Sequence, residues 1–88
     1  MSDYESIDCS TYSEYELAII RGARLRLRWR DESNIDHFEI VRPVDLETRR
    51  GEEFLIAETA GGPRLRVRLD RIQQALIVPA SAQSKRHQ

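Results

Sequence analysis

Strict alternation of apolar and basic residues marks the two clearest strands in this chain. Residues 24–30 have the sequence RLRLRWR, so a strand here places Leu25, Leu27 and Trp29 on one face and four arginines on the other. Residues 64–69, with the sequence RLRVRL, repeat the pattern. Both segments therefore predict β-strands with an apolar inner face and a basic outer face.

Three further strands are predicted by shorter apolar runs that lie between turn residues, over residues 35–46, 53–59 and 72–78. Pro43 interrupts the first of these runs. Because proline cannot donate a hydrogen bond to a neighbouring strand, Pro43 predicts a bulge or an edge position. A turn is expected over residues 47–51, whose glycine can adopt a positive φ.

A helix is predicted over about residues 10–21. Apolar side chains recur there at helical spacing and share one face: Tyr12, Tyr15, Ala18 and Ile19. Gly22 suits the position just after a helix, where glycine readily adopts the left-handed conformation. Three residues are candidate N-caps: Asp8, Ser10 and Ser13. Ser13 also has the spacing of a capping box with Glu16.

These elements predict a mainly β protein with one N-terminal helix, in the form of a small antiparallel β-barrel. Five short strands in an open sheet would leave long unpaired edges, whereas a closed barrel removes them. Eighty-eight residues are enough for one domain only. We expect an extended acidic segment over residues 1–9, the folded domain over residues 10–78 and a disordered tail over residues 79–88.

Charge is segregated along the chain, although the formal net charge is only −1. The first twenty residues contain no lysine or arginine and five acidic residues: Asp3, Glu5, Asp8, Glu14 and Glu16. The next ten residues contain five arginines and no acidic residue. The protein is therefore expected to present separate acidic and basic surfaces, and these surfaces indicate its partners better than the net charge does.

The residues that enzymes use are scarce in this sequence. It contains two histidines, His37 and His87, and one cysteine, Cys9, with no zinc-ligand spacing and no glycine-rich phosphate loop. We therefore predict a binding protein with no catalytic residue, no cofactor and no metal, in which His37 lies on a strand surface and Cys9 is buried. The lone cysteine, with no apolar run of about 18 residues and no secretory signal, predicts a cytoplasmic location.

Three segments together resemble the Rof-type family, the Rho-binding antiterminators that modulate Rho-dependent transcription termination in bacteria. The first segment is YESIDCSTYSEYELA, over residues 4–18. The second is VDLETRRGEEFL, over residues 44–55, and the third is RVRLDRI, over residues 66–72. The resemblance covers about residues 4–78, which is nearly the whole predicted folded part.

The resemblance implies a helix packed on an Sm-like, SH3-like β-barrel, and it implies a partner. Such proteins bind the RNA-binding N-terminal domain of the helicase Rho and block its primary RNA site. Carried onto this chain, the contact residues are Asp8, Tyr12, Glu14 and Glu16, with Arg49 and Arg50 in the basic turn as weaker candidates. A site that binds a polyanion can accept carboxylates, because they form charge-assisted hydrogen bonds with its basic groups.

On this hypothesis the protein is a non-enzymatic inhibitor of Rho, monomeric when free, with no membrane association and no direct binding to nucleic acid. Simpler interpretations stay open: Asp8 can be only a helix cap, and Tyr12 can belong to the core. Glu14 and Glu16 can form a solvated helix face. Acidic pairs near the predicted turn are expected to be solvated charges, namely Asp45 with Glu47 and Glu52 with Glu53, and Asp70 is expected to be structural.

A second function also stays open, that of a small Sm-like RNA-binding module. The arginine-rich strands would contact phosphates, and Trp29 or Phe38 would stack on bases. If these strands were neighbours, like charges would face each other unless acids such as Asp36, Glu39 and Glu58 intervened. The alternation around Trp29, however, favours a place for its side chain in the core.

Overall fold

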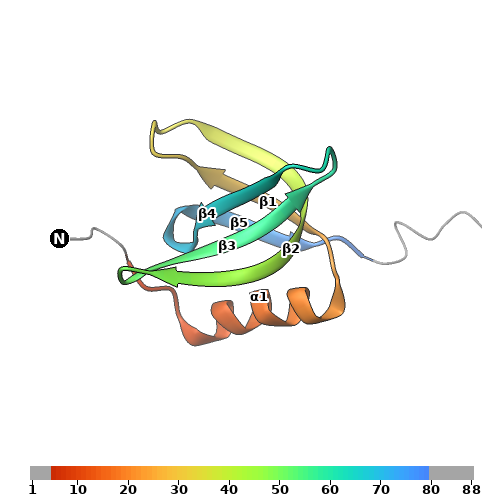
Figure 1. The fold of residues 1–88 in the computed structure, drawn as a ribbon, viewed down its shortest axis with the longest axis horizontal. Helices are drawn as coiled ribbons and strands as arrows, with labels where there is room; N and C mark the ends of the chain where they lie inside the picture. Colours follow the sequence, from red (N-terminus) through yellow and green to blue (C-terminus); the bar gives the residue numbers. More distant parts are fainter. Residues whose placement is uncertain (1–4, 80–88) are drawn as a thin grey trace, which may run out of the picture.

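The computed structural model describes residues 5–79 and shows one helix followed by a five-stranded antiparallel sheet. The elements are α1 (Cys9–Arg21), β1 (Leu25–Arg30), β2 (Asp36–Arg49), β3 (Glu52–Thr59), β4 (Arg64–Arg68), the 3-10 turn η1 (Leu69–Arg71) and β5 (Ile72–Ile77). The strand order is β4-β3-β2-β1-β5, so the first four strands form a meander and β5 returns to pair with β1. Figure 1 shows that the sheet is strongly curved and that α1 lies alongside β2. The predicted class, mainly β with one N-terminal helix, is confirmed.

The predicted helix start and the predicted end of the last strand each differ by one residue from the observed ones. α1 begins one residue before the predicted start at residue 10, and β5 ends one residue before the predicted end at residue 78. The prediction of a disordered tail over residues 79–88 falls outside the described residues from residue 80 onward. The first four residues of the acidic segment over residues 1–9 also lie outside them.

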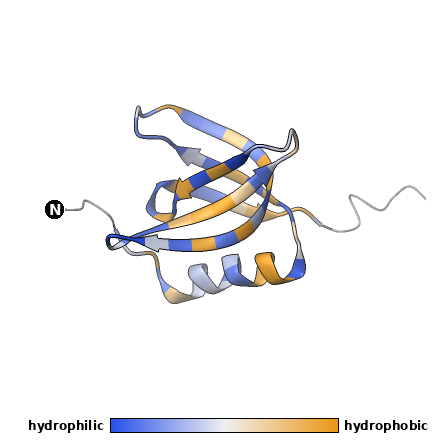
Figure 2. Ribbon diagram, viewed as in Figure 1, coloured by the Kyte–Doolittle hydropathy of each residue, from blue (hydrophilic) through white to orange (hydrophobic). Residues whose placement is uncertain are grey.

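The core lies between α1 and the inner face of the sheet, and its buried apolar residues are Tyr15, Ala18, Leu25, Leu27, Trp29, Val41, Leu55, Ala57, Val67 and Leu69. Every second residue of β1 belongs to this core, and the residues between them are exposed arginines. The predicted alternation is therefore confirmed, and Figure 2 shows it as bands of apolar and polar colour along the strands. The side chain of Trp29 is only 7% exposed, so the suggestion that it stacks on bases is wrong.

The main correction to the predicted strands concerns the end of β2. The sequence predicted a turn over residues 47–51, whereas β2 continues to Arg49 and only Arg50 and Gly51 precede β3. The φ angles of these two residues are 54° and 79°. Positive φ at both central positions is what a two-residue type I′ hairpin requires, and such turns match the natural twist of the strands.

Pro43 has the role that its chemistry predicted. The pairing of β2 with β3 shifts register between Pro43 and Asp45, which marks a bulge or irregularity at this point. The side chain of Pro43 is fully buried, among the largest side chains with less than 2% exposure. Figure 1 shows that the long strand β2 is strongly bent, and a bulge of this kind increases the bending of a strand.

The helix begins and ends with the caps that its flanking residues favour. Asp8 is the N-cap, and its carboxylate accepts a hydrogen bond from the backbone N–H of Thr11 at 3.0 Å. Ser13 lies inside α1, so the predicted capping box with Glu16 is wrong. Gly22 follows the helix with a φ of 64°, and its N–H donates to the carbonyl of Ile19 at 3.2 Å.

Replacing Gly22 with alanine is expected to lower the free energy of unfolding by about 1–2 kcal/mol, because a Cβ disfavours the left-handed conformation. No atom lies within 4 Å of the added Cβ, so the backbone conformation alone produces the effect. Urea unfolding at neutral pH measures the change. The control is Gly61→Ala, where φ is outside the left-handed region and the nearest atom is at an ordinary 3.6 Å. Equal losses in the two variants would contradict the explanation.

Candidate functional site

Tyr12 lies among carboxylates that come from α1 and from the hairpin of β2 and β3. Its ring is half-buried and packs against the core. Burial raises the pKa of the Tyr12 hydroxyl, and the negative charges of Glu53, Glu16 and Asp45 raise it further. Three carboxylates from three elements thus act on one hydroxyl. We call Asp8, Tyr12, Glu16, Asp45 and Glu53 together the acidic surface.

A groove of about 410 Å³ opens beside Tyr12. It is lined by the segment before the helix, the first turns of α1 and the start of β3, through Ser6, Ile7, Cys9, Tyr12, Ser13 and Glu53. Figure 1 agrees, since the start of α1 lies beside the turn that joins β2 to β3. Cys9 is exposed, so the prediction that it is buried is wrong.

Asp8 serves both as a helix cap and as part of the acidic surface. Hydrogen bonds from Thr11 lower the pKa of Asp8, with a smaller contribution from Ser10. The carboxylate is therefore ionised at neutral pH, while the residue remains exposed to solvent. Because an N-cap carboxylate satisfies one orphan backbone donor and keeps further lone pairs, the two roles are compatible.

Glu14 lies apart from the other predicted contact residues. Side chains two positions apart in a helix point about 200° apart, so Glu14 points away from Tyr12. Glu16, one turn after Tyr12, lies on the same side of the helix as Tyr12. The neighbour of Glu14 is Tyr15, whose pKa is raised to about 12 by burial first and by the charge of Glu14 second. The fold therefore brings Asp8, Tyr12 and Glu16 together and directs Glu14 to another exposed part of the helix.

Arg49 and Arg50 lie at the tip of the β2–β3 hairpin, and both are exposed. Arg49 is paired in register with Glu52, and Arg50 occupies the first position of the two-residue turn. Glu53, near this end of the hairpin, lines the same groove as Ser6 and Ile7 of the segment that precedes α1. The two arginines therefore border the acidic surface instead of forming a surface of their own.

Sequence analysis missed Asp45 and Glu53 as members of this surface and treated them as solvated turn charges. They belong to opposite strands of one hairpin, and the register shift after Pro43 determines how they align. The helix then packs beside β2 and brings Tyr12 to them. Their position in the second segment that resembles the Rof-type family was the one available signal.

Asp70 ties the segment before α1 to the sheet. Its carboxylate accepts hydrogen bonds from the guanidinium of Arg68 at 2.7 and 3.0 Å and from the backbone N–H of Glu5 at 3.2 Å. Burial acts to raise the pKa of Asp70, but these hydrogen bonds outweigh it and hold the pKa below its usual value. The structural role predicted for Asp70 is confirmed, and it extends to positioning the start of the acidic surface.

Asp70→Asn is expected to lower the free energy of unfolding at pH 7 by about 1.5–3 kcal/mol, the range for hydrogen bonds to a charged group. Because the folded pKa lies below the reference of 3.8, the ion contributes stability above that pH and loses it as the pH falls further. Urea unfolding should show a smaller difference in stability between the two proteins at about pH 3 than at pH 7. An equal loss of stability at the two pH values would contradict this explanation. The control is Glu32→Gln, at an exposed position.

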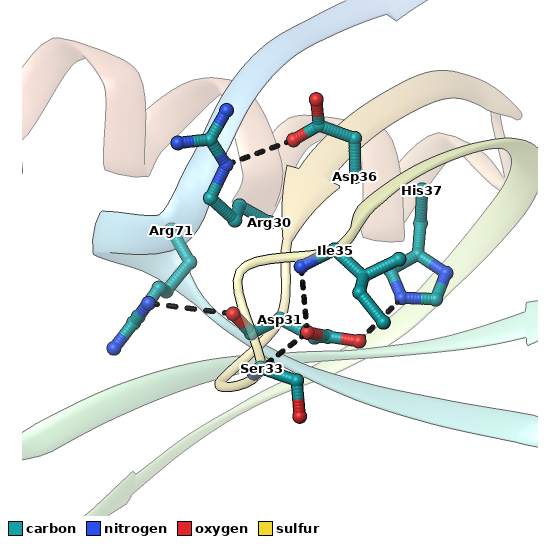
Figure 3. A network of polar contacts seen from close by, with 7 residues as sticks. All are labelled: Arg30, Asp31, Ser33, Ile35, Asp36, His37 and Arg71. Carbon is teal, nitrogen blue, oxygen red and sulfur yellow. Dashed lines mark hydrogen bonds and ion pairs between the residues drawn. The ribbon is translucent and has the colours of Figure 1, made fainter.

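A polar network stabilises the turn between β1 and β2 (Figure 3). The carboxylate of Asp31 accepts hydrogen bonds from the N–H groups of Ser33 and Ile35 at 2.8 and 3.1 Å and contacts the ring of His37 at 2.7 Å. The contact with His37 is the largest of the effects that lower the pKa of Asp31. Trp29 stacks on His37 with ring centroids 4.9 Å apart. His37 therefore has structural partners on both sides of its half-buried ring.

A second cavity, of about 350 Å³, lies between this turn and β4. Several arginines line it, but they are engaged with other groups. Arg30 forms an ion pair with Asp36 at 2.9 Å, and Arg66 lies 4.4 Å above the ring of Phe54. We assign these side chains to holding the turn and the strands together.

The two arginine-rich strands are not neighbours, because β2 and β3 lie between β1 and β4. The arginines of β4 are each paired with an acid: Arg64 with Glu58 at 3.2 Å, Arg66 with Glu47 at 3.2 Å and Arg68 with Asp70 at 2.7 Å. Of the acids expected to neutralise arginines, Asp36 pairs with Arg30 and Glu58 with both Arg42 and Arg64, whereas Glu39 forms no ion pair within residues 5–79. The basic surface is therefore much reduced on β4.

Neither a metal site nor a membrane-spanning helix is present within residues 5–79. No group of three or more His, Cys, Asp and Glu side chains in this range is placed to hold a metal ion. No helix in the same part of the chain is long and apolar enough to cross a membrane.

Comparison with known proteins identifies a shared fold. No family model and no curated protein matches the chain. Among solved structures, the chain is similar to part of proteasome accessory factor B/C (PafBC) of Arthrobacter aurescens, with a TM-score of 0.69 and 20% sequence identity. The match covers 98% of this chain and 15% of that one, so this chain corresponds to a small part of PafBC. At this identity the similarity concerns the fold alone.

Proposed function

We propose that the protein is a non-enzymatic inhibitor of transcription termination factor Rho. On this proposal it binds the RNA-binding N-terminal domain of Rho through the acidic surface, and so blocks the access of RNA and reduces termination. The observation that carries the proposal is the groove lined by Tyr12 and Glu53, where the negative charges of Glu53, Glu16 and Asp45 act on the half-buried Tyr12. The three segments that resemble the Rof-type family support the same partner.

The chemistry of the acidic surface suits a partner that normally binds RNA. A basic RNA site attracts phosphates, and carboxylates held by a folded surface can take their place with charge-assisted hydrogen bonds. Tyr12 adds an aromatic ring with a polar hydroxyl at the edge of a groove, and tyrosine is enriched among the residues that dominate binding energy. Arg49 and Arg50 at the border could contact acidic groups on the rim of the partner's site.

The proposal also includes a more specific fold, in which the curved sheet closes into an Sm-like barrel. The two end strands of the sheet order, β4 and β5, are joined by the single turn η1, which favours their approach and the closure of the curved sheet. Closure would protect both edges from pairing with other chains. The proposal also includes a cytoplasmic protein that is monomeric when free and needs neither a cofactor nor a metal.

A calorimetric titration of the isolated RNA-binding domain of Rho with the full chain tests this function. We expect saturable binding that weakens as the salt concentration rises, because salt screens the attraction between charges on the two surfaces. Absence of binding at low salt would overturn the proposal. Binding that strengthens with salt would also contradict it, since an apolar contact and not the carboxylates would then be responsible.

A further inference from the structure

The outer face of β1 carries a second surface that the proposed function does not use. Leu25, Leu27 and Trp29 point into the core that α1 covers. Successive side chains of a strand point to opposite faces, so Arg26 and Arg28 point away from that core. Both arginines are exposed.

Pairing places each of these arginines in a row across three strands. One row consists of Phe38 in β2, Arg28 in β1 and Gln74 in β5, and the other of Ile40, Arg26 and Leu76. The apolar members are exposed to solvent: Phe38 by 63%, Ile40 by 44% and Leu76 by 50%. We call these six residues the basic face. It combines two cations with an exposed aromatic ring and two exposed aliphatic side chains.

The charges of the basic face are not neutralised within residues 5–79. Neither Arg26 nor Arg28 forms an ion pair in this part of the chain, in contrast to all three arginines of β4. The charge of Arg28 acts on Asp36, whose pKa is lowered mainly by its hydrogen bond from Arg30 and only slightly by Arg28. That carboxylate is already bound by Arg30 at 2.9 Å.

We propose that the basic face binds single-stranded RNA, with Arg26 and Arg28 on neighbouring phosphates and Phe38 stacked on a base. This goes beyond the inhibition of Rho and departs from the expectation that the protein does not bind nucleic acid directly. The choice of RNA over single-stranded DNA rests on the proposed function, because an inhibitor of Rho acts where RNA is bound. The site itself does not depend on that function.

Geometry and charge favour a nucleic acid over an acidic protein on this face. Residues two positions apart in a strand are separated by about 6.8 Å, which suits successive groups of an extended polymer. An exposed aromatic ring beside arginines is the combination by which sheets bind unstacked bases and their backbone. Gln74, in the same row as Phe38 and Arg28, adds a side-chain amide that can donate to and accept from a base edge.

The experiment measures the anisotropy of a short fluorescein-labelled oligouridine as the full chain is added, without Rho. Two phosphate contacts predict a slope of about −1.4 for log affinity against log salt, or a sevenfold loss between about 50 and 200 mM salt. Arg26→Ala with Arg28→Ala should bring this slope close to zero. Phe38→Leu keeps the apolar contact but loses stacking and should weaken binding by about 5- to 150-fold.

The matched control is Arg64→Ala with Arg66→Ala, which removes the same charge from the paired arginines of β4 and should leave most of the binding. Equal losses in the two double variants, or no binding of oligouridine at low salt, would overturn the proposal. Tighter binding of oligothymidine would overturn the choice of RNA. If the Arg26 and Arg28 variant lost affinity for Rho and kept affinity for oligouridine, the basic face would be a protein contact instead.

Discussion

Reversing the charges of Glu14 and Glu16 together is expected to weaken binding to the RNA-binding domain of Rho by more than about tenfold, while the protein stays folded. Losing one partner of a buried interface charge pair costs about 2–5 kcal/mol, and a lysine adds repulsion from a basic site. Because α1 begins at Cys9, both residues lie beyond its first turn, where the effect of the helix dipole falls off. The free energy of unfolding should therefore change by only about 0.5 kcal/mol.

Calorimetric titration of Rho and urea unfolding of each variant measure these two effects separately. Single variants separate the two residues: Glu16→Lys, beside Tyr12, should account for most of the loss, and Glu14→Lys for less. The matched control is Glu32→Lys with Glu39→Lys, which changes the net charge equally at two exposed positions outside the helix. If the control lost as much affinity, the total charge would be responsible, and the acidic surface would not be the contact.

Replacing Leu27 with alanine is expected to lower the free energy of unfolding by about 2–5 kcal/mol, the range for deleting a buried leucine side chain. Leu27 is completely buried at the middle of β1, which pairs with both β2 and β5. Total stabilities of small domains are about 5–15 kcal/mol, so this single change removes a large fraction. Urea unfolding followed by circular dichroism measures it.

Leu17→Ala is the control for this prediction, because Leu17 lies on the outside of α1 and is 45% exposed. The loss of stability in Leu17→Ala should be small, because this side chain buries less apolar surface when the protein folds than Leu27 does. If Leu27→Ala destabilised the protein no more than Leu17→Ala, β1 would not be the central strand of a packed core. The strand order and the alternation of β1 would then need another explanation.

Sequence patterns predicted the strands well wherever one face is buried and the other is solvated. Apolar residues in β1 and β4 alternate with arginines, and only one register places them all in the core. Pro43 and Gly22 were equally informative, because each restricts the backbone in a way that holds in any fold. The extension of β2 to Arg49 was missed, since polar residues there give no apolar period.

The candidate site was predictable only in part, because its members come from distant parts of the chain. Asp8, Tyr12 and Glu16 are neighbours in sequence, and helical spacing alone relates Tyr12 to Glu16. Asp45 and Glu53 join them only after β2 and β3 have paired and α1 has packed alongside β2, and no local pattern encodes that contact. The predicted capping box was wrong for a local reason: the helix begins after its N-cap Asp8, so Ser13 lies inside it.

Competition between the protein and RNA for Rho tests the central claim most directly. The RNA-binding domain of Rho is loaded with a labelled pyrimidine-rich RNA, and the Arg26→Ala, Arg28→Ala variant is added as competitor. This variant keeps the acidic surface and lacks the cations of the basic face, so any release of RNA cannot come from its capture by the competitor. We predict full displacement of the RNA at saturating protein. A stable complex that contains Rho, RNA and the variant together would contradict the claim.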